Sequence, residues 1–252
     1  MLTVLYRDDV LIAIDKPAGW LVHRSNLDRH ETRILVQVLR DQIGRHVYPV
    51  HRLDKGTSGV MLFALAPDVA GRLGAQFARH EVRKTYLAVV RGWPAAAGTI
   101  DHPLARSRDA YGNRAEGDSA EKTAAETAPD LMAQSAITDF RLLATVELPH
   151  AVDRYPTSRY ALVALHPRTG RWHQLRRHMK HIAHPIIGDA THGKGCHNRF
   201  FQAQFGCDRL LLACTGLGFS HPADGRAMEL RAPVGDRFAE VLDRLGWRGA
   251  AA

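Results

Sequence analysis

Apolar residues along the chain occur in two patterns, short continuous runs and stretches with helical spacing. Residues 10–14 form an apolar run that ends at residues 15–19, a segment with turn chemistry, and they predict a strand followed by a loop. From Thr32 onward apolar residues recur at helical spacing, which predicts a helix that ends at Gly44. Residues 60–66 form a second apolar run of strand length, which we expect to be buried on both faces.

The same two patterns continue to the end of the chain. Asp68 is expected to cap a helix that carries Val69 and Leu73. A helix is also expected over residues 172–183, ended by His184-Pro185. Four further segments predict strands: residues 84–91, 159–166, 209–213 and 228–231. Because strands and helices do not alternate regularly and no repeat is visible, we predict an α+β fold with a mixed, largely antiparallel sheet.

One segment interrupts this pattern. Residues 106–135 are rich in Ala, Glu, Asp, Arg and Gly, with hardly any large apolar residue, and they predict a flexible surface insertion. The length of 252 residues suits one large mixed domain, and the 45% hydrophobic and 24% charged content is typical of globular proteins. We therefore expect a single domain over residues 1–252.

The charge balance indicates the kind of partner. Lys plus Arg exceed Asp plus Glu by 34 to 26, a net charge of +8 that favours a polyanion, although solubility alone is an alternative explanation. A secretory leader and an apolar run of about 20 residues are both missing from the sequence, so we expect a cytoplasmic protein that contacts no membrane. The three cysteines lack C-x-x-C spacing, which argues against a disulfide framework or a zinc ribbon.

The 15 histidines raise the question of a metal site. His178, His181 and His184 are spaced by three, but H-E-x-x-H does not accompany them. Neighbouring cations such as Arg177 and Lys180 oppose metal binding, so we interpret the cluster as a basic surface facing RNA and expect no metal.

The densest polar cluster lies at residues 51–59, immediately before the second apolar run. An acid at such an edge, here Asp54, is well placed to meet a substrate, but it can equally be a turn residue that accepts local amide hydrogen bonds. A hydrolase with Ser58 as nucleophile and His51 and Asp54 as partners is a weaker hypothesis. The segment lacks the G-x-S-x-G elbow, and triad members normally converge from separate segments.

Two later segments suggest anion binding. Residues 188–194 fit a phosphate loop until Gly195 stands where Ser or Thr should bind magnesium, and Asp189 inside the loop opposes phosphate, so we expect no nucleotide cofactor. Residues 168–178 concentrate positive charge as a solvated face or a phosphate clamp. One of their arginines, placed in the core, would instead hold a carboxylate ionised.

Taken together, these segments resemble the RluA-type pseudouridine synthases. The resemblance covers nearly the whole chain outside residues 106–135 and implies the pseudouridine synthase fold. It is carried by Lys16-Pro17-Ala18-Gly19, His51-Arg52-Leu53-Asp54 with Thr57-Ser58-Gly59, Lys84-Thr85-Tyr86-Leu87-Ala88, Gly170-Arg171-Trp172-His173-Gln174-Leu175-Arg176 and His184-Pro185-Ile186-Ile187-Gly188-Asp189. One departure is Ala213, where the family commonly has His.

The resemblance also implies the roles of individual residues. Asp54 is the catalytic acid, Tyr86 stacks on the target base and can assist proton removal, and Arg176 pairs with Asp54. Substrate binding is assigned to Arg52, which would help extrude the uridine, and to His51, Lys84, Leu175 and His173. The reaction implied is conversion of uridine to pseudouridine without a cofactor.

Residues 16–25 and 154–160 resemble the branch of the family that modifies uridine 65 of tRNA. That branch implies tRNA as the partner, and we expect a monomer. Two alternatives stay open, a pseudouridine synthase acting on ribosomal RNA and a noncatalytic RNA-binding protein.

Overall fold

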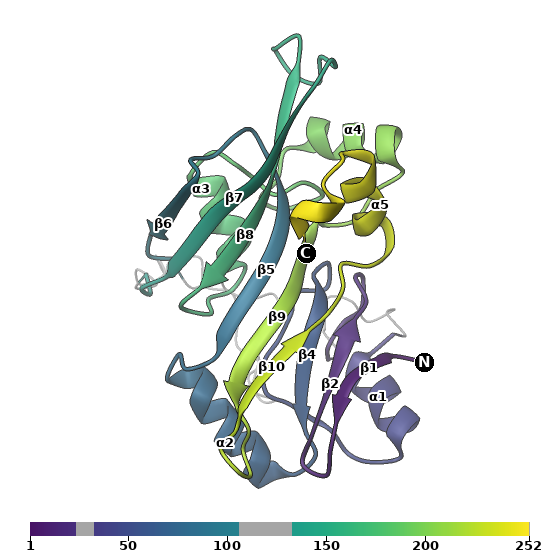
Figure 1. Ribbon diagram of the computed structural model, residues 1–252, viewed down its shortest axis with the longest axis vertical. Coiled ribbons are helices and arrows are strands. Elements are labelled where there is room, and N and C mark those ends of the chain that lie inside the picture. Colours follow the sequence, from purple (N-terminus) through teal and green to yellow (C-terminus); the bar gives the residue numbers. More distant parts are fainter. Residues whose placement is uncertain (24–32, 106–132, 252) are drawn as a thin grey trace, which may run out of the picture.

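The computed structural model describes residues 1–23, 33–105 and 133–251. In this part of the chain ten strands form one sheet, in the order β1-β2-β4-β9-β5-β8-β7-β6, with β10 paired to β9 and β3 to β4 (Figure 1). The strands are β1 (Thr3–Arg7), β2 (Leu11–Lys16), β3 (Tyr48–Pro49), β4 (Ser58–Ala64), β5 (Arg83–Arg91), β6 (Ala97–Asp101), β7 (Ile137–Leu148), β8 (Ser158–Pro167), β9 (Leu212–Ser220) and β10 (Ala227–Arg231).

Helices pack against this sheet. They are α1 (Leu35–Ile43), α2 (Pro67–Ala78), α3 (Gln174–His181), α4 (Gly195–Phe205) and α5 (Asp236–Arg244), followed by the 3-10 helix η1 (Arg248–Ala251). All strand pairs between these elements are antiparallel except β4 with β9. The predicted α+β fold with a mixed, largely antiparallel sheet is therefore confirmed. Among the described residues, none of the helices is long and apolar enough to cross a membrane.

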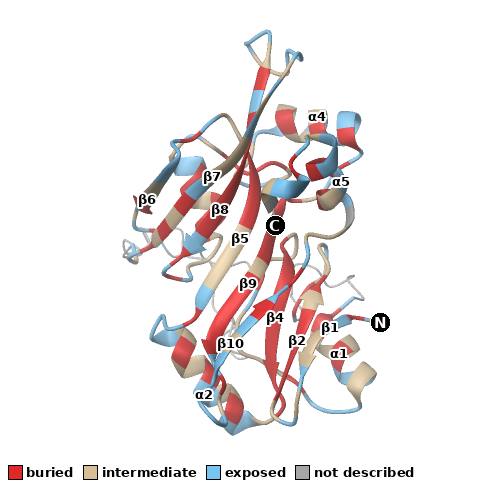
Figure 2. Ribbon diagram, viewed as in Figure 1, coloured by how far each residue is buried: buried red, intermediate tan, exposed pale blue. Residues whose placement is uncertain are grey.

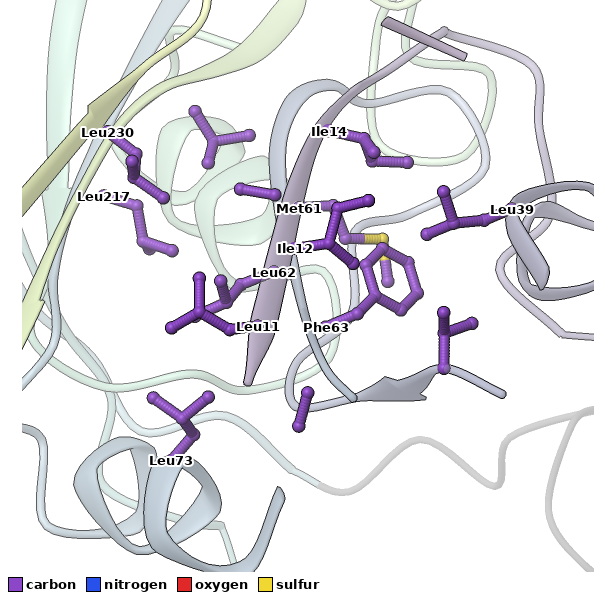
Figure 3. Close-up of a cluster of buried hydrophobic side chains, with 14 of the residues drawn as sticks. Leu11, Ile12, Ile14, Leu39, Met61, Leu62, Phe63, Leu73, Leu217 and Leu230 are labelled. Atoms are coloured by element: carbon purple, nitrogen blue, oxygen red, sulfur yellow. The ribbon is translucent and has the colours of Figure 1, made fainter. Parts of the chain in front are cut away.

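The sheet has two halves that meet at β9. The first half comprises β1 to β4 with α1 and α2, and one apolar cluster joins Leu35 and Leu39 of α1 and Leu73 of α2 to β2 and β4. Figure 3 shows Leu39 and Leu73 with side chains of β2 and β4 from this cluster. All seven residues of β4 are buried, as its apolar run predicted (Figure 2). In the second half, α4 and α5 pack against β5 and β8 in one apolar cluster. Helix α3 packs against the same two strands in another apolar cluster, through Leu175 and Met179.

Strand β9 joins the two halves, because it pairs with β5 on one side and in parallel with β4 on the other, where Gly59 lies opposite Cys214. Gly59 has a φ of +108°, and a Cβ at this position would lie 2.0 Å from the carbonyl oxygen of Cys214. A side chain therefore does not fit at position 59. This contact places the segment before β4, which carries Asp54, beside the second half of the sheet.

Several sequence predictions hold and two are wrong. Gly44 ends α1 in the left-handed conformation, with a φ of 65°, as expected. Asp68 does not cap α2: the N-cap is Ala66 without a side-chain hydrogen bond, Pro67 begins the helix, and Asp68 pairs with Arg72. Proline preorganises the first helical turn and needs no amide partner there, so it replaces the expected cap.

The strand predicted over residues 209–213 is also wrong, because β9 runs from Leu212 to Ser220. Gly216 and Gly218 weaken the strand pattern in the sequence, but a Cβ at Gly218 would lie 2.8 Å from the carboxylate of Glu229. Neighbouring side chains thus occupy the space that these glycines leave. The insertion predicted at 106–135 lies outside the described residues up to residue 132, and its end pairs Gln134 with Leu104.

Candidate active site

Asp54 lies in the loop that precedes β4, and its side chain is 29% exposed. The amide of Thr57 donates to the backbone oxygen of Asp54 at 3.0 Å, so the segment is a turn, as the turn hypothesis expected. The carboxylate itself contacts groups from the second half of the sheet. Asp54 is therefore both a turn residue and an acid presented to a distant segment.

Lys16 holds this loop from the interior. Its side chain is fully buried, and Nζ donates to the backbone oxygens of Pro17 at 3.0 Å, Lys55 at 3.1 Å and Thr57 at 2.8 Å. Burial lowers the pKa of Lys16 to about 7, against the opposing effect of the Asp54 charge. The buried ammonium thus ties Lys55 and Thr57, which follow Asp54, to the end of β2.

Arg176, in the first turn of α3, makes the predicted pair with Asp54. Its Nη1 donates to Asp54 Oδ2 at 3.1 Å. Nε and Nη2 of the same guanidinium donate to Asp189 Oδ2 at 2.7 Å and Oδ1 at 2.8 Å. Burial lowers the pKa of Arg176, but the hydrogen bonds and charges of Asp189 and Asp54 outweigh it and raise the pKa above its ordinary value. The cation is thus fixed between two carboxylates.

Asp189 is a member of the site to which the sequence analysis gave no role. Its side chain is fully buried, and Oδ1 also accepts the amides of Thr191 and His192 at 2.9 Å each. Burial raises the pKa of Asp189, but the hydrogen bonds from Arg176 and these amides outweigh it, so the pKa lies below its usual value. The amides that resembled a phosphate loop therefore bind a carboxylate of the chain itself.

Two histidines lie beside this ion pair. Nε2 of His173 is 3.7 Å from Asp54 Oδ2, and its Nδ1 is 3.0 Å from Nε2 of His192. His173 has a φ of 51° just before α3, and its ring stacks on Trp172 with 3.6 Å between centroids. Burial lowers the pKa of His173 to about 4, although the Asp54 charge opposes this shift. Both rings are therefore neutral acceptors or donors at neutral pH.

Tyr86 lies on β5, opposite Cys214 of β9, and is hydrogen-bonded to the Cys214 thiol. Burial, reinforced by Cys214 and by the negative charge of Asp54, raises the pKa of Tyr86 well above its ordinary value. A phenol with such a pKa is a poor base at neutral pH. Its predicted stacking on the target base stays a prediction.

The remaining predicted substrate-binding residues differ in their surroundings. Arg52 is exposed, and Lys84 donates through Nζ to the oxygen of Thr169 at 3.5 Å. Leu175 is 7% exposed and packs in the core beneath α3. His51 contacts Leu62 of β4 and Phe77 of α2. Roles of these residues in substrate binding stay predictions.

The hydrolase hypothesis receives no support from the side chains it invoked. Nε2 of His51 accepts the amide of Leu62 at 3.0 Å, and its ring stacks on Phe77. Oγ of Ser58 accepts a hydrogen bond from Arg209 Nη2 at 2.8 Å. Since His51 and Ser58 each bond elsewhere, they do not form a triad with Asp54.

Potential metal ligands gather at one place in the described chain. Ligand atoms of Asp153, Cys196 and His197 lie within 4.8 Å of one another. Lys194 pairs with Asp153, however, and Arg91 Nε donates to His197 Nε2 at 3.1 Å. These cations oppose a metal ion, and Arg91 occupies one of the two ring nitrogens of His197.

Comparison with known proteins places this site in a family. A family model described as RNA pseudouridylate synthase matches residues 10–181. A tRNA pseudouridine synthase C from Vibrio cholerae serotype O1 is 48% identical over 98% of this chain and 97% of its own length. The protein of the same name from Yersinia pestis is 48% identical over 100% of this chain and 93% of its own.

Solved structures agree with this assignment. The chain resembles Human RNA Pseudouridylate Synthase Domain Containing 1 with a TM-score of 0.69 and 27% identity, over 97% of this chain and 87% of that one. The match to the family model spans Asp54, Tyr86 and Arg176, and both the predicted fold and the predicted family are confirmed. The chain belongs to the RNA pseudouridylate synthase family and is a pseudouridine synthase.

Proposed function

We propose that this enzyme converts a uridine of tRNA, uridine 65, to pseudouridine, with Asp54 as its catalytic carboxylate. The observation that carries the proposal is the pairing of Asp54 with Arg176, whose other face is fixed by buried Asp189. The full-length alignment with relatives named tRNA pseudouridine synthase C supports tRNA as the substrate. The proposal of position 65 is supported by residues 16–25 and 154–160, which resemble the branch of the family that modifies uridine 65 of tRNA.

The reaction needs an ionised carboxylate and no added atom. The glycosidic bond from C1′ to N1 breaks, the uracil turns, and C1′ joins C5. Asp54 either attacks the sugar or abstracts a sugar proton, and Arg176 supplies a compensating positive charge 3.1 Å away in both routes. Protein groups alone suffice for this chemistry.

Asp54 can reach the sugar only after the base has left its stack, which costs a few kcal/mol. Arg52 is exposed two residues before the acid and is suited to fill the gap left by the base. Tyr86 lies close enough to Asp54 to feel its charge, and its ring is suited to stack on the extruded uracil. Arg52 would thus occupy the RNA at the vacated position, and Tyr86 would hold the extruded base.

The net charge of +8 suits a tRNA ligand, whose binding should weaken as salt rises. Asp54, Arg176 and His173 all come from one chain, so we expect a monomer to be active. A tRNA substrate also implies a cytoplasmic location.

The direct test is release of tritium from tRNA labelled at uracil C5, with purified protein in EDTA. We expect stoichiometric release and a pseudouridine at position 65, mapped by sequencing. Tritium release from ribosomal RNA but not tRNA would support the ribosomal alternative. Binding of tRNA without release would indicate a noncatalytic RNA-binding protein.

A further inference from the structure

We propose that His173 and His192 form a proton relay that carries the C5 proton of the uracil from Asp54 to solvent. The relay rests on the proposed role of Asp54. It assigns to His173 a task beyond substrate binding and gives His192 a role in the reaction.

The need for a relay follows from the last step of the reaction. Once C1′ has joined C5, that carbon must lose its hydrogen as a proton to restore the ring. Tyr86 is hydrogen-bonded to Cys214 and is a poor base, and the guanidinium of Arg176 stays protonated. Asp54 is the remaining acceptor beside the sugar, and it must be ionised again before the next turnover.

The geometry supplies a path away from Asp54. Nε2 of His173 lies 3.7 Å from Asp54 Oδ2, a distance that must shorten for transfer, and catalytic hydrogen bonds commonly shorten when substrate binds. The other nitrogen of His173 is 3.0 Å from His192 Nε2. Trp172 stacks on one ring and meets the other edge-on, so the two imidazoles are held in this orientation.

The surroundings of both rings keep them neutral and able to pass a proton. His173 faces Asp54, Asp189, Arg176 and His192, and burial outweighs the acids and lowers its pKa to about 4. His192 is half-buried, and burial, together with the charges of the basic residues, outweighs Asp189 and lowers its pKa. The basic residues around His192 are Arg176, Arg177 and Lys180. A proton accepted at this pair is therefore released readily to water.

The transfers balance atom by atom. The C5–H bond breaks, its electron pair restores the C5–C6 double bond, and Asp54 takes the proton. Asp54 Oδ2 passes it to His173 Nε2, the proton on His173 Nδ1 moves to His192 Nε2, and His192 releases its Nδ1 proton to water. Uracil N1 takes one proton from solvent, so the isomerisation is proton-neutral. After product leaves, exchange with solvent restores the starting tautomers.

Two substitutions at position 192 separate a relay from a purely positioning contact. His192→Gln can place its amide oxygen where Nε2 lies and still accept a hydrogen bond from His173 Nδ1, but an amide side chain does not relay a proton. His192→Phe keeps the ring against Trp172 and removes both nitrogens. The matched control is His46→Gln, at an exposed histidine after α1.

We expect both His192 variants to lose about 100-fold in kcat for tRNA with an unchanged KM, since general acid–base groups contribute at least that much. The solvent deuterium isotope effect on kcat should rise, because transfer of the proton from Asp54 to solvent becomes rate-limiting. The rate at which the His192 variants rearrange tRNA containing 5-fluorouridine should equal the wild-type rate. Fluorine does not leave C5 as a cation, so the step served by the relay is skipped. His46→Gln should behave as the wild type in all three assays.

Three results would overturn the relay: an active Gln variant beside an inactive Phe variant, two active variants, or an equal loss on 5-fluorouridine tRNA. Thermal unfolding checks that each variant is folded. If a His192 variant is not folded, His173→Gln replaces it and is assayed for the same three properties. If the wild type released no tritium, the proposed function itself would fail. A wild type that releases tritium beside fully active variants would defeat only the relay.

Discussion

The two halves of the sheet hold their parts of the site in different ways. The first half presents Asp54 on a turn whose backbone is fixed by local hydrogen bonds and by two bonds from Lys16. The second half presents Arg176 on a helix, and the guanidinium is fixed by a single buried side chain, Asp189. Contiguous backbone therefore positions the acid, whereas one long-range ion pair positions the cation.

Because of this difference, we expect amino-acid substitutions to affect the two halves differently. A turn held by many backbone bonds tolerates side-chain substitutions around it, because backbone groups persist. A buried ion pair depends on both members, since removal of one leaves the other charge without compensation. We therefore expect substitution of Asp54 to lower catalytic activity alone, and substitution of Arg176 to lower both catalytic activity and stability.

The largest effect should come from Asp54→Asn. Loss of the carboxylate should reduce kcat by about 10⁴-fold or more, because the reacting group itself is removed. Affinity for tRNA should change little, because phosphate contacts dominate binding. Single-turnover tritium release and a filter-binding assay measure the two quantities. Substantial activity of this variant would refute the role of Asp54.

The next largest effect should come from Gly59→Ala, at the contact between the halves. A Cβ there would lie 2.0 Å from Cys214 O at a φ of +108°, so we expect a loss of about 4 kcal/mol in unfolding free energy. The control is Gly71→Ala on α2, where open space surrounds the Cβ and a gain of up to about 1 kcal/mol is expected. Urea unfolding measures both, and equal stabilities would show that the halves tolerate separation.

Arg176→Lys tests the second half directly. Lysine offers a point charge in place of the guanidinium that bonds both Asp189 oxygens and Asp54, so we expect a fall of about 100-fold in kcat and about 2 kcal/mol in stability. The exposed Arg72→Lys serves as the control and should change stability by less than about 0.5 kcal/mol. Retention of full activity by Arg176→Lys would mean that charge without fixed geometry suffices.

At neutral pH the smallest effect concerns Lys16, because its contribution to stability grows only as pH rises. Since its folded-state pKa is about 7, below the ordinary 10.5, the unfolded chain holds the proton more tightly between these values. The contribution of Lys16 to stability therefore rises as pH increases from about 7 to about 10.5, by at most about 1.4 kcal/mol per pH unit. Lys16→Met should lack this rise. Urea unfolding of both proteins at pH 6, 8 and 9 tests it, and parallel pH curves would disprove it.

Parts of the fold were predictable where one local pattern determines the structure. The fully apolar run of β4 and the glycine that ends α1 are read directly from neighbouring residues. The course of β9 was not, because Gly216 and Gly218 are poor strand residues whose place is set by side chains on β5 and β10. Strand β7 and helices α4 and α5 were likewise not predicted from local pattern.

The sequence by itself predicted the family and the pairing of Asp54 with Arg176, because these residues lie in contiguous motifs. Only the tertiary structure decided what fixes that partner and what surrounds the acid. Asp189 follows Arg176 by 13 residues and Lys16 precedes Lys55 by 39, and in each pair the contact involves a buried charged side chain. The burial of a charge and the identity of its partner depend on how distant segments pack, and local pattern carries no record of that packing.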